Sequence, residues 1–214
     1  MTSSAPSPRT EVHRKSQRAH HDAATVHAII DQALACHIAF QEGGSVHCLP
    51  TACWRDGEFL YIHGANNSRL TRALLADECA LCITHLDGLV LARSAFHHSM
   101  NYRSVAIYGR FTEVTDQEAK AAAFHRFVEH VSPGRAGQVR LPSRAETAGT
   151  RLLRIPLDEA VAKIRNWGVE DSADDMAIPV WAGVLPLALR AGPLQPEASC
   201  AEYPPPSRPA FISG

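Results

Sequence analysis

The feature of this 214-residue sequence that most restricts its fold is a series of short β-prone runs separated by two-residue turn signals. The runs at 36–41, 45–54 and 58–63 are separated by Gly43-Gly44 and Asp56-Gly57. Such pairs are typical of hairpins, because glycine adopts the positive φ angles that tight turns require. Connections this short join antiparallel strands, since a parallel crossover needs a dozen or more residues. The pattern therefore favours an antiparallel sheet over a doubly wound parallel one.

The rest of the sequence continues this alternation of strands with a few helices. Asp87-Gly88 is interpreted as a further hairpin turn, and the later strands are expected at 80–85, 89–94, 103–114, 151–157 and 161–167. Three helices are expected: one capped by Asp22, a short one after Asn66-Asn67, and one that starts at Thr115 with a capping box to Glu118. Strand-rich runs with interspersed helices predict a mainly β fold, an antiparallel barrel with helical additions.

The two ends of the chain differ in composition from its centre. Residues 1–21 are rich in Ser, Pro, Arg and His without apolar periodicity, and residues 192–214 are rich in proline. We expect both to be extended or flexible, because they offer little apolar surface to offset chain entropy. One folded domain is therefore expected over residues 22–191.

The bulk composition excludes several classes of function. Lys and Arg number 21 against 22 Asp and Glu, so no nucleic-acid partner is expected. No apolar stretch reaches the length of a membrane helix, and the polar N-terminus lacks the apolar region of a signal peptide. We therefore expect a cytoplasmic protein without a membrane partner, whose six cysteines are free thiols.

The segment from Leu60 to Arg69 is the most informative candidate site. A strand ends at Gly64, an Asn pair precedes a helix, and Ser68 and Arg69 lie in its first turn. The unpaired amides of a helix N-terminus suit a phosphate, and a guanidinium adds a bidentate donor. Taken alone, the segment is better explained as an ordinary capped surface helix with a solvated arginine, because such helices are common.

A second polar segment, 98–105, lies at the start of a well-patterned strand. Asn101, Tyr102, Arg103 and Ser104 offer hydrogen-bonding groups for a heteroaromatic ring and a ribityl chain. In isolation, the segment is better explained as a loop-to-strand junction with a surface arginine.

No metal site is predicted. Cys79 and Cys82 are three residues apart on an expected strand, so their thiols point to opposite faces. The histidines, among them His47, His63 and His98, have no HxxxH or HExxH spacing. Haem ligation by a histidine remains open.

Taken together and in order, these segments resemble the flavin-nucleotide-binding branch of the pyridoxamine 5′-phosphate oxidase superfamily, which includes relatives of the nitroimidazole reductases. The resemblance covers about residues 15 to 190 and rests on five motifs: His47-Cys48-Leu49-Pro50-Thr51, Tyr61 to Ala65 with Ser68-Arg69, Asp87 to Ser94, Asn101 to Ser104, and Pro179 to Val184.

This resemblance implies a six-stranded split β-barrel that forms a homodimer and binds FMN between its subunits. By the same resemblance, Pro50 and Thr51 run along the flavin ring, and the strand end with His63, Gly64 and Ala65 contacts the ring and ribityl chain. Ser68 and Arg69 match the pair that holds the phosphate. The remaining expected cofactor contacts are Asn101, Tyr102, Arg103, Ser104, Lys163 and Trp181.

The sequence also departs from the vitamin B6 enzymes of that superfamily. Leu70 stands where they carry a lysine after the Ser-Arg pair, and a proline-rich tail replaces their substrate-binding end. Vitamin B6 chemistry is therefore not assigned.

The resulting hypothesis is an FMN-dependent oxidoreductase that acts on a small molecule with electrons from NAD(P)H. His63 is the candidate catalytic residue, as a hydrogen-bond or proton donor beside the ring. A purely structural role for His63 at the end of the strand is an equally supported alternative. A non-catalytic flavin-binding protein and a haem-binding protein on the same fold are the alternative functions, and the haem alternative predicts that replacing His63 or His98 abolishes a Soret band.

Overall fold

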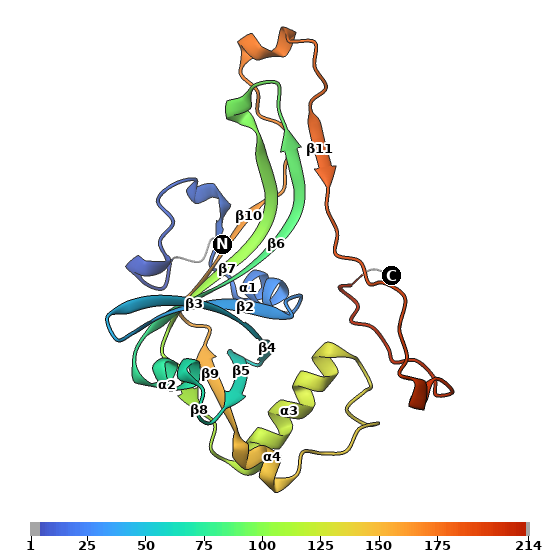
Figure 1. Cartoon of the computed structure of the whole chain (residues 1–214). Helices are drawn as coiled ribbons and strands as arrows, with labels where there is room; N and C mark the ends of the chain where they lie inside the picture. Colours follow the sequence, from blue (N-terminus) through green and yellow to red (C-terminus); the bar gives the residue numbers. More distant parts are fainter. Residues whose placement is uncertain (1–4, 213–214) are drawn as a thin grey trace.

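A computed structural model describes residues 5–212 of the chain and shows two antiparallel sheets with helices around them (Figure 1). The larger sheet has the order β1-β10-β7-β6-β2-β3, with β11 paired to β6, and the smaller sheet has the order β4-β5-β9-β8. The strands are β1 (Ala19–His20), β2 (Ala35–Glu42), β3 (Ser45–Ala52), β4 (Trp54–Asp56), β5 (Phe59–Ala65), β6 (Cys79–Leu91), β7 (Ser99–Gly109), β8 (Thr112–Glu113), β9 (Thr150–Pro156), β10 (Ala160–Arg165) and β11 (Gly183–Pro186). The helices are α1 (Ala23–Ile30), α2 (Arg69–Ala76), α3 (Gln117–Val131) and α4 (Arg144–Gly149).

The turn signals of the sequence form hairpins as predicted. Gly43 and Gly44 have φ angles of 59° and 78° and connect β2 to β3, where Glu42 pairs with Ser45. Two successive positive φ angles are the signature of a type I′ turn, which matches the twist of the paired strands. Gly57, with φ of 58°, lies in the connection between β4 and β5. The antiparallel fold class is thereby confirmed.

The two sheets enclose the main core, with α1 and α2 packed at its edges. Alternate residues of each strand point inward, so Val105 and Ile107 of β7 are fully buried, as their spacing predicts. A second, aromatic cluster lies on the far side of the smaller sheet, where α3 packs against it. Strand β5 contributes to both, with Leu60 and Ile62 in the main core and Tyr61 in the aromatic cluster.

The interpretation of Asp87-Gly88 as a hairpin turn is wrong. Both residues lie inside β6, which continues to Leu91 and has only a register shift between Leu86 and Gly88. The glycine serves a different purpose, because β11 pairs with this part of β6. A Cβ on Gly88 would lie 3.1 Å from the carbonyl oxygen of Leu185.

Helix α3 begins one residue later than predicted. Its N-cap is Asp116, whose carboxylate accepts a hydrogen bond from the amide of Ala119 at 2.8 Å, so the expected capping box of Thr115 and Glu118 does not form. Aspartate is as good an N-cap as threonine or better, which explains the shift. The predicted end of the helix at Ser132 is confirmed.

The β6–β7 hairpin extends well beyond the barrel, and β11 lies beside it (Figure 1). We refer to residues 86–100 and β11 as the hairpin arm. Large apolar side chains near this arm are exposed, including Phe96 and Trp181. The described part of the N-terminal segment lies against the larger sheet, where β1 pairs with β10. No helix within residues 5–212 is long and apolar enough to span a bilayer.

Candidate functional site

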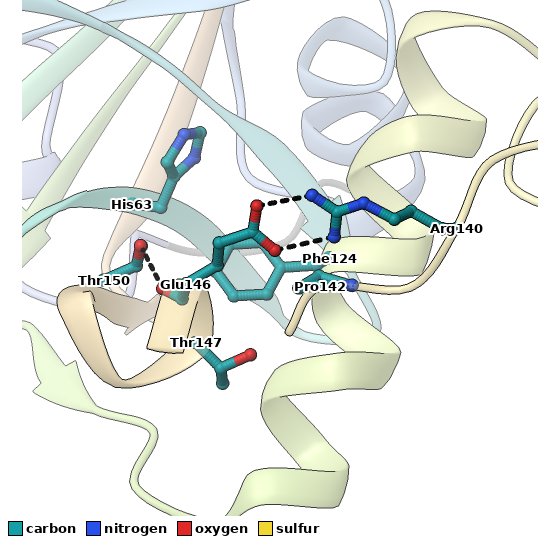
Figure 2. Close-up of a pocket in the computed structure, with 7 residues that line it drawn as sticks. All are labelled: His63, Phe124, Arg140, Pro142, Glu146, Thr147 and Thr150. Carbon is teal, nitrogen blue, oxygen red and sulfur yellow. Dashed lines mark hydrogen bonds and ion pairs between the residues drawn. The ribbon is translucent and has the colours of Figure 1, made fainter. Parts of the chain in front are cut away.

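A cavity of about 460 Å³ opens beside the end of β5, between this strand, α3 and α4. Cavities of this size hold small organic ligands and cofactors. Figure 2 shows the side chain of His63 on one wall and the arginine-carboxylate pair of Arg140 and Glu146 on another. The lining residues are His63, Phe124, Arg140, Pro142, Glu146, Thr147 and Thr150.

His63 points into the aromatic cluster rather than into the barrel. Its ring centroid lies 5.9 Å from that of Trp54, 5.9 Å from Phe124 and 5.2 Å from Phe127. The Nδ1 atom is buried without a hydrogen-bond partner. Burial lowers the pKa of His63 below its ordinary value of 6.5, because the apolar surroundings disfavour the imidazolium. The imidazole is therefore neutral near pH 7, the form in which histidine ligates metals.

The second wall of the cavity is built by α4 and the loop before it. Lys120 of α3 is buried and donates hydrogen bonds to the carbonyl oxygens of Thr147 and Thr150 at 2.8 and 2.7 Å. These bonds fix the end of α4 on the smaller sheet. The start of α4 has a capping box, in which Ser143 and Glu146 exchange side-chain and backbone hydrogen bonds.

Arg140 and Glu146 form a bidentate ion pair at the mouth of this cavity, with nitrogen-oxygen distances of 2.6 and 2.7 Å. The hydrogen bonds from Arg140 and Ser143 lower the pKa of Glu146 to about 2, so the pair is charged at neutral pH. The Arg140 side chain is 72% exposed, and solvent therefore screens much of the attraction.

The predicted phosphate site lies on the opposite face of β5. Residues next to each other on a strand point to opposite faces, so Gly64 faces α2 while His63 faces α3. A Cβ on Gly64 would lie 2.9 Å from Cγ2 of Thr71, and this close approach requires the glycine. The side chain of Ser68 makes no capping hydrogen bond, and Arg69 pairs with Glu42 at 3.2 Å. Ala65 ends β5 and is exposed.

The residues predicted to lie along the flavin ring divide between two faces of β3. Pro50 pairs with His37 and is on the exposed outer face of the larger sheet, whereas Thr51 pairs with the buried Cys36 and faces inward. Their side chains therefore point to opposite faces of the sheet.

Ser104 and Lys163 are paired neighbours on the same outer face as Pro50, and the hydroxyl of Ser104 donates to the carbonyl oxygen of Lys163 at 3.3 Å. Strands β2 and β6 separate them from β3. Three inter-strand spacings place Pro50 and Ser104 roughly 14 Å apart. The two predicted groups of flavin contacts do not meet within one chain.

Three other residues predicted to contact the flavin interact or pair with residues of the chain itself, and a fourth, Trp181, is largely exposed. Arg103 donates to both carboxylate oxygens of Asp87, at 2.9 and 2.8 Å, and also to Gln32 at 2.9 Å. Asn101 is buried and accepts a hydrogen bond from Arg165, and Tyr102 pairs with Arg165 across β7 and β10. Trp181, which is 68% exposed, lies just before β11.

The wall formed by Arg140, Glu146 and α4 was not expected from the sequence. The available signal was the spacing Ser143-Arg144-Ala145-Glu146, which fits a capping box. The expected separation of Cys79 and Cys82 is confirmed, since Cys79 is buried and Cys82 is exposed. Within the described residues, one group has metal-ligand geometry, formed by His97, Asp171 and Asp175. Asp171 is already paired with Arg93 at 2.8 Å.

Comparison with known proteins identifies relatives of the whole chain. The family model described as pyridoxamine 5′-phosphate oxidase matches residues 22–164. The flavocytochrome Anf3 from Azotobacter vinelandii is 34% identical, with a TM-score of 0.90 over 98% of this chain and 99% of that one. An FAD- and haem-binding protein from Mycobacterium smegmatis is 30% identical, with a TM-score of 0.83 over 88% of this chain and 94% of that one.

A more distant structure shows the fold alone. A protein assigned to 5-nitroimidazole antibiotic resistance in Bacteroides thetaiotaomicron is 21% identical, with a TM-score of 0.55 over 68% of this chain and 86% of that one. No curated protein sequence matches the chain. From the family match and the full-length similarity, the chain belongs to the pyridoxamine 5′-phosphate oxidase-like family, whose split-barrel fold it has.

Proposed function

We propose that this protein is a flavin-dependent oxidoreductase that also binds haem, with one cofactor on each face of β5. The observation that carries this proposal is the state of His63, whose neutral imidazole lines an aromatic cavity and has a buried Nδ1 without a hydrogen-bond partner. The residue next to it, Gly64, packs against the helix that carries the predicted phosphate site. The two relatives at or above 30% identity support this function, since one is a flavocytochrome and the other binds FAD and haem.

In this proposal, FMN or the FMN moiety of FAD binds near the start of α2. The first turn of α2 has no side-chain cap, so its amides and the hydroxyl of Ser68 are available to a phosphate. Arg69 supplies a guanidinium there once it leaves Glu42. FMN and FAD share this moiety, so these residues would hold either.

The haem half rests on the fit between the His63 cavity and a haem group. Haem proteins provide an axial ligand that faces an apolar pocket. His63 would ligate the haem iron, Phe124 and Pro142 would supply apolar contact, and Arg140 also lines the cavity. His98 fits the role less well, since it is exposed and its Nδ1 lies 2.9 Å from the carbonyl oxygen of Ser94. When bound, the two cofactors supply hydride acceptance and single-electron transfer.

The lowered pKa of His63 favours ligation over proton donation. A proton donor must hold its proton at the working pH, and burial removes that proton near neutrality. We therefore assign His63 to the haem and leave proton supply to solvent.

The flavin site is completed by a second copy of the chain. Pro50 and Ser104 lie on the same outer face of the larger sheet but about 14 Å apart, by the strand spacing. A second copy against this face brings its own Ser104 and Lys163 toward the β3 region of the first. Homodimer formation and the use of NAD(P)H are part of the proposal.

An anaerobic titration with NADPH tests the proposed function. The protein is reconstituted with FMN or FAD and with hemin, and excess ligand is removed. We expect NADPH to bleach the flavin band and shift the Soret band, and His63→Ala to abolish only the Soret change. Retention of flavin without haem would leave a flavoprotein and overturn the haem assignment. Retention of neither cofactor would overturn the whole proposal.

A further inference from the structure

We propose that Arg140 recognises a carboxylate of the ligand in the His63 cavity, and that Glu146 and this carboxylate are alternative partners of Arg140. The inference rests on the proposed function and adds a residue to it that determines which ligands the cavity accepts. The ligand class is a planar, mainly apolar ring that carries carboxylate groups.

The chemistry of the cavity wall supports this ligand class. The part of the wall that would contact the ring of the ligand is neutral and largely apolar, and consists of His63, Phe124 and Pro142. Arg140 and Glu146 are the charged residues that line it, and they lie together at one side (Figure 2). A ligand with a coordinating centre and a distant carboxylate therefore finds an imidazole at one wall and a guanidinium at the other.

The bond between Arg140 and Glu146 is of a kind that a ligand carboxylate can replace. It is a bidentate guanidinium-carboxylate pair, and a carboxylate on a ligand offers the same two oxygens in the same plane. Exchange of one carboxylate for another conserves both hydrogen bonds. The pair is well exposed, so Glu146 is resolvated at little cost after the exchange.

The segment that carries Arg140 has few other attachments. Residues 137–143 are exposed throughout. The preceding part of the loop is held by Glu129, which accepts hydrogen bonds from the amides of Gly134 and Ala136 at 2.7 and 2.8 Å. Glu146 itself has a second role in the capping box of α4. It therefore keeps a function when Arg140 turns to the ligand.

The test compares hemin with hemin dimethyl ester, which lacks the carboxylates, by Soret titration. Because the pair is exposed and one carboxylate replaces another, we expect the unmodified protein to bind hemin about fivefold more tightly than the ester. Arg140→Ala is expected to reduce this preference to about twofold or less by weakening hemin alone. Glu146→Gln, which keeps the capping box, is expected to strengthen hemin binding. Arg135→Ala, a nearby exposed arginine that contacts Gln138, is the matched control and leaves both affinities unchanged.

Each outcome has one meaning. If Arg140→Ala weakens both probes equally, or neither, then Arg140 only positions the loop and the inference is wrong. Weaker hemin binding by Glu146→Gln would contradict it too. If the unmodified protein gives no Soret band with hemin, the haem assignment fails first, and the inference fails with it.

Discussion

The two faces of β5 carry different chemistry although they belong to one strand. One face contributes Leu60 and Ile62 to the barrel core and brings Gly64 against α2. The other face contributes Tyr61 to the aromatic cluster and points His63 into a cavity under α3 and α4. The first face requires a glycine at position 64, and the second carries an imidazole that we propose to ligate haem.

This difference shows how one strand end can serve two sites. Neighbouring residues on a strand point in opposite directions, so His63 and Gly64 are adjacent in sequence but belong to separate surfaces. A single short segment thus holds both proposed redox groups near each other, with a peptide backbone between them. The substitutions below perturb one face of β5 at a time.

His63→Ala has the largest expected effect. We expect complete loss of the Soret band with retention of flavin absorbance, because the proposed haem ligand is removed and α2 is untouched. His98→Ala is the control, since it lies on the hairpin arm, and should keep both bands. Equal loss of flavin and haem in His63→Ala would contradict the separation of the two faces.

Gly64→Ala perturbs the other face. The new Cβ meets Cγ2 of Thr71 at 2.9 Å, so α2 must shift, and overpacking of this kind costs about 1–3 kcal/mol. We expect weaker flavin binding in a fluorescence titration and a lower Tm, with an unchanged Soret band. The second substitution Thr71→Ser removes Cγ2 and should restore flavin binding. Gly149→Ala, where a Cβ meets open space, is the matched control.

Arg69→Ala tests the phosphate site with a smaller effect. The guanidinium is half-exposed and pairs with Glu42, so we expect a loss of about 1 kcal/mol in flavin binding. Glu42→Gln should strengthen binding, because it frees Arg69. Arg72→Ala, whose guanidinium instead donates to the carbonyl oxygen of Asn67, should have little effect in the same titration.

The smallest expected effect is on stability as the pH falls. Burial lowers the pKa of folded His63 below 6.5, whereas the unfolded chain keeps the ordinary value. Below pH 6.5 the unfolded state therefore binds more protons, and the free energy of unfolding decreases as the pH drops toward the folded pKa. Urea unfolding of the haem-free protein and of His63→Phe at about pH 7.5 and 5.5 checks this. An equal decrease in both proteins would assign the pH dependence to other groups.

Much of the fold was predictable from local patterns. The hairpins at Gly43-Gly44 and Asp56-Gly57 follow from turn chemistry, and the buried positions of β7 follow from alternation. Asp87-Gly88 has the same turn signal but lies inside β6, because the later strand β11 approaches Gly88. A local signal does not contain that distant contact.

The candidate site was predictable only in part. His63, Ser68 and Arg69 were candidates from the sequence, but the sequence did not show that β5 separates the first from the other two. The division follows from strand parity, which depends on the exact strand boundaries. The Arg140 and Glu146 wall depends on how Lys120 of α3 holds α4, a contact across about 30 residues of chain. No spacing in the sequence specifies this contact between Lys120 and the end of α4.

The central claim is that the two faces of β5 hold two separate cofactor sites. Its most direct test is the addition of hemin to flavin-loaded protein, followed by removal of free ligand and an absorbance spectrum. The account predicts that the Soret band appears while the bound flavin stays with the protein. Release of flavin in proportion to the hemin bound would show that both ligands compete for one site, and would contradict the account.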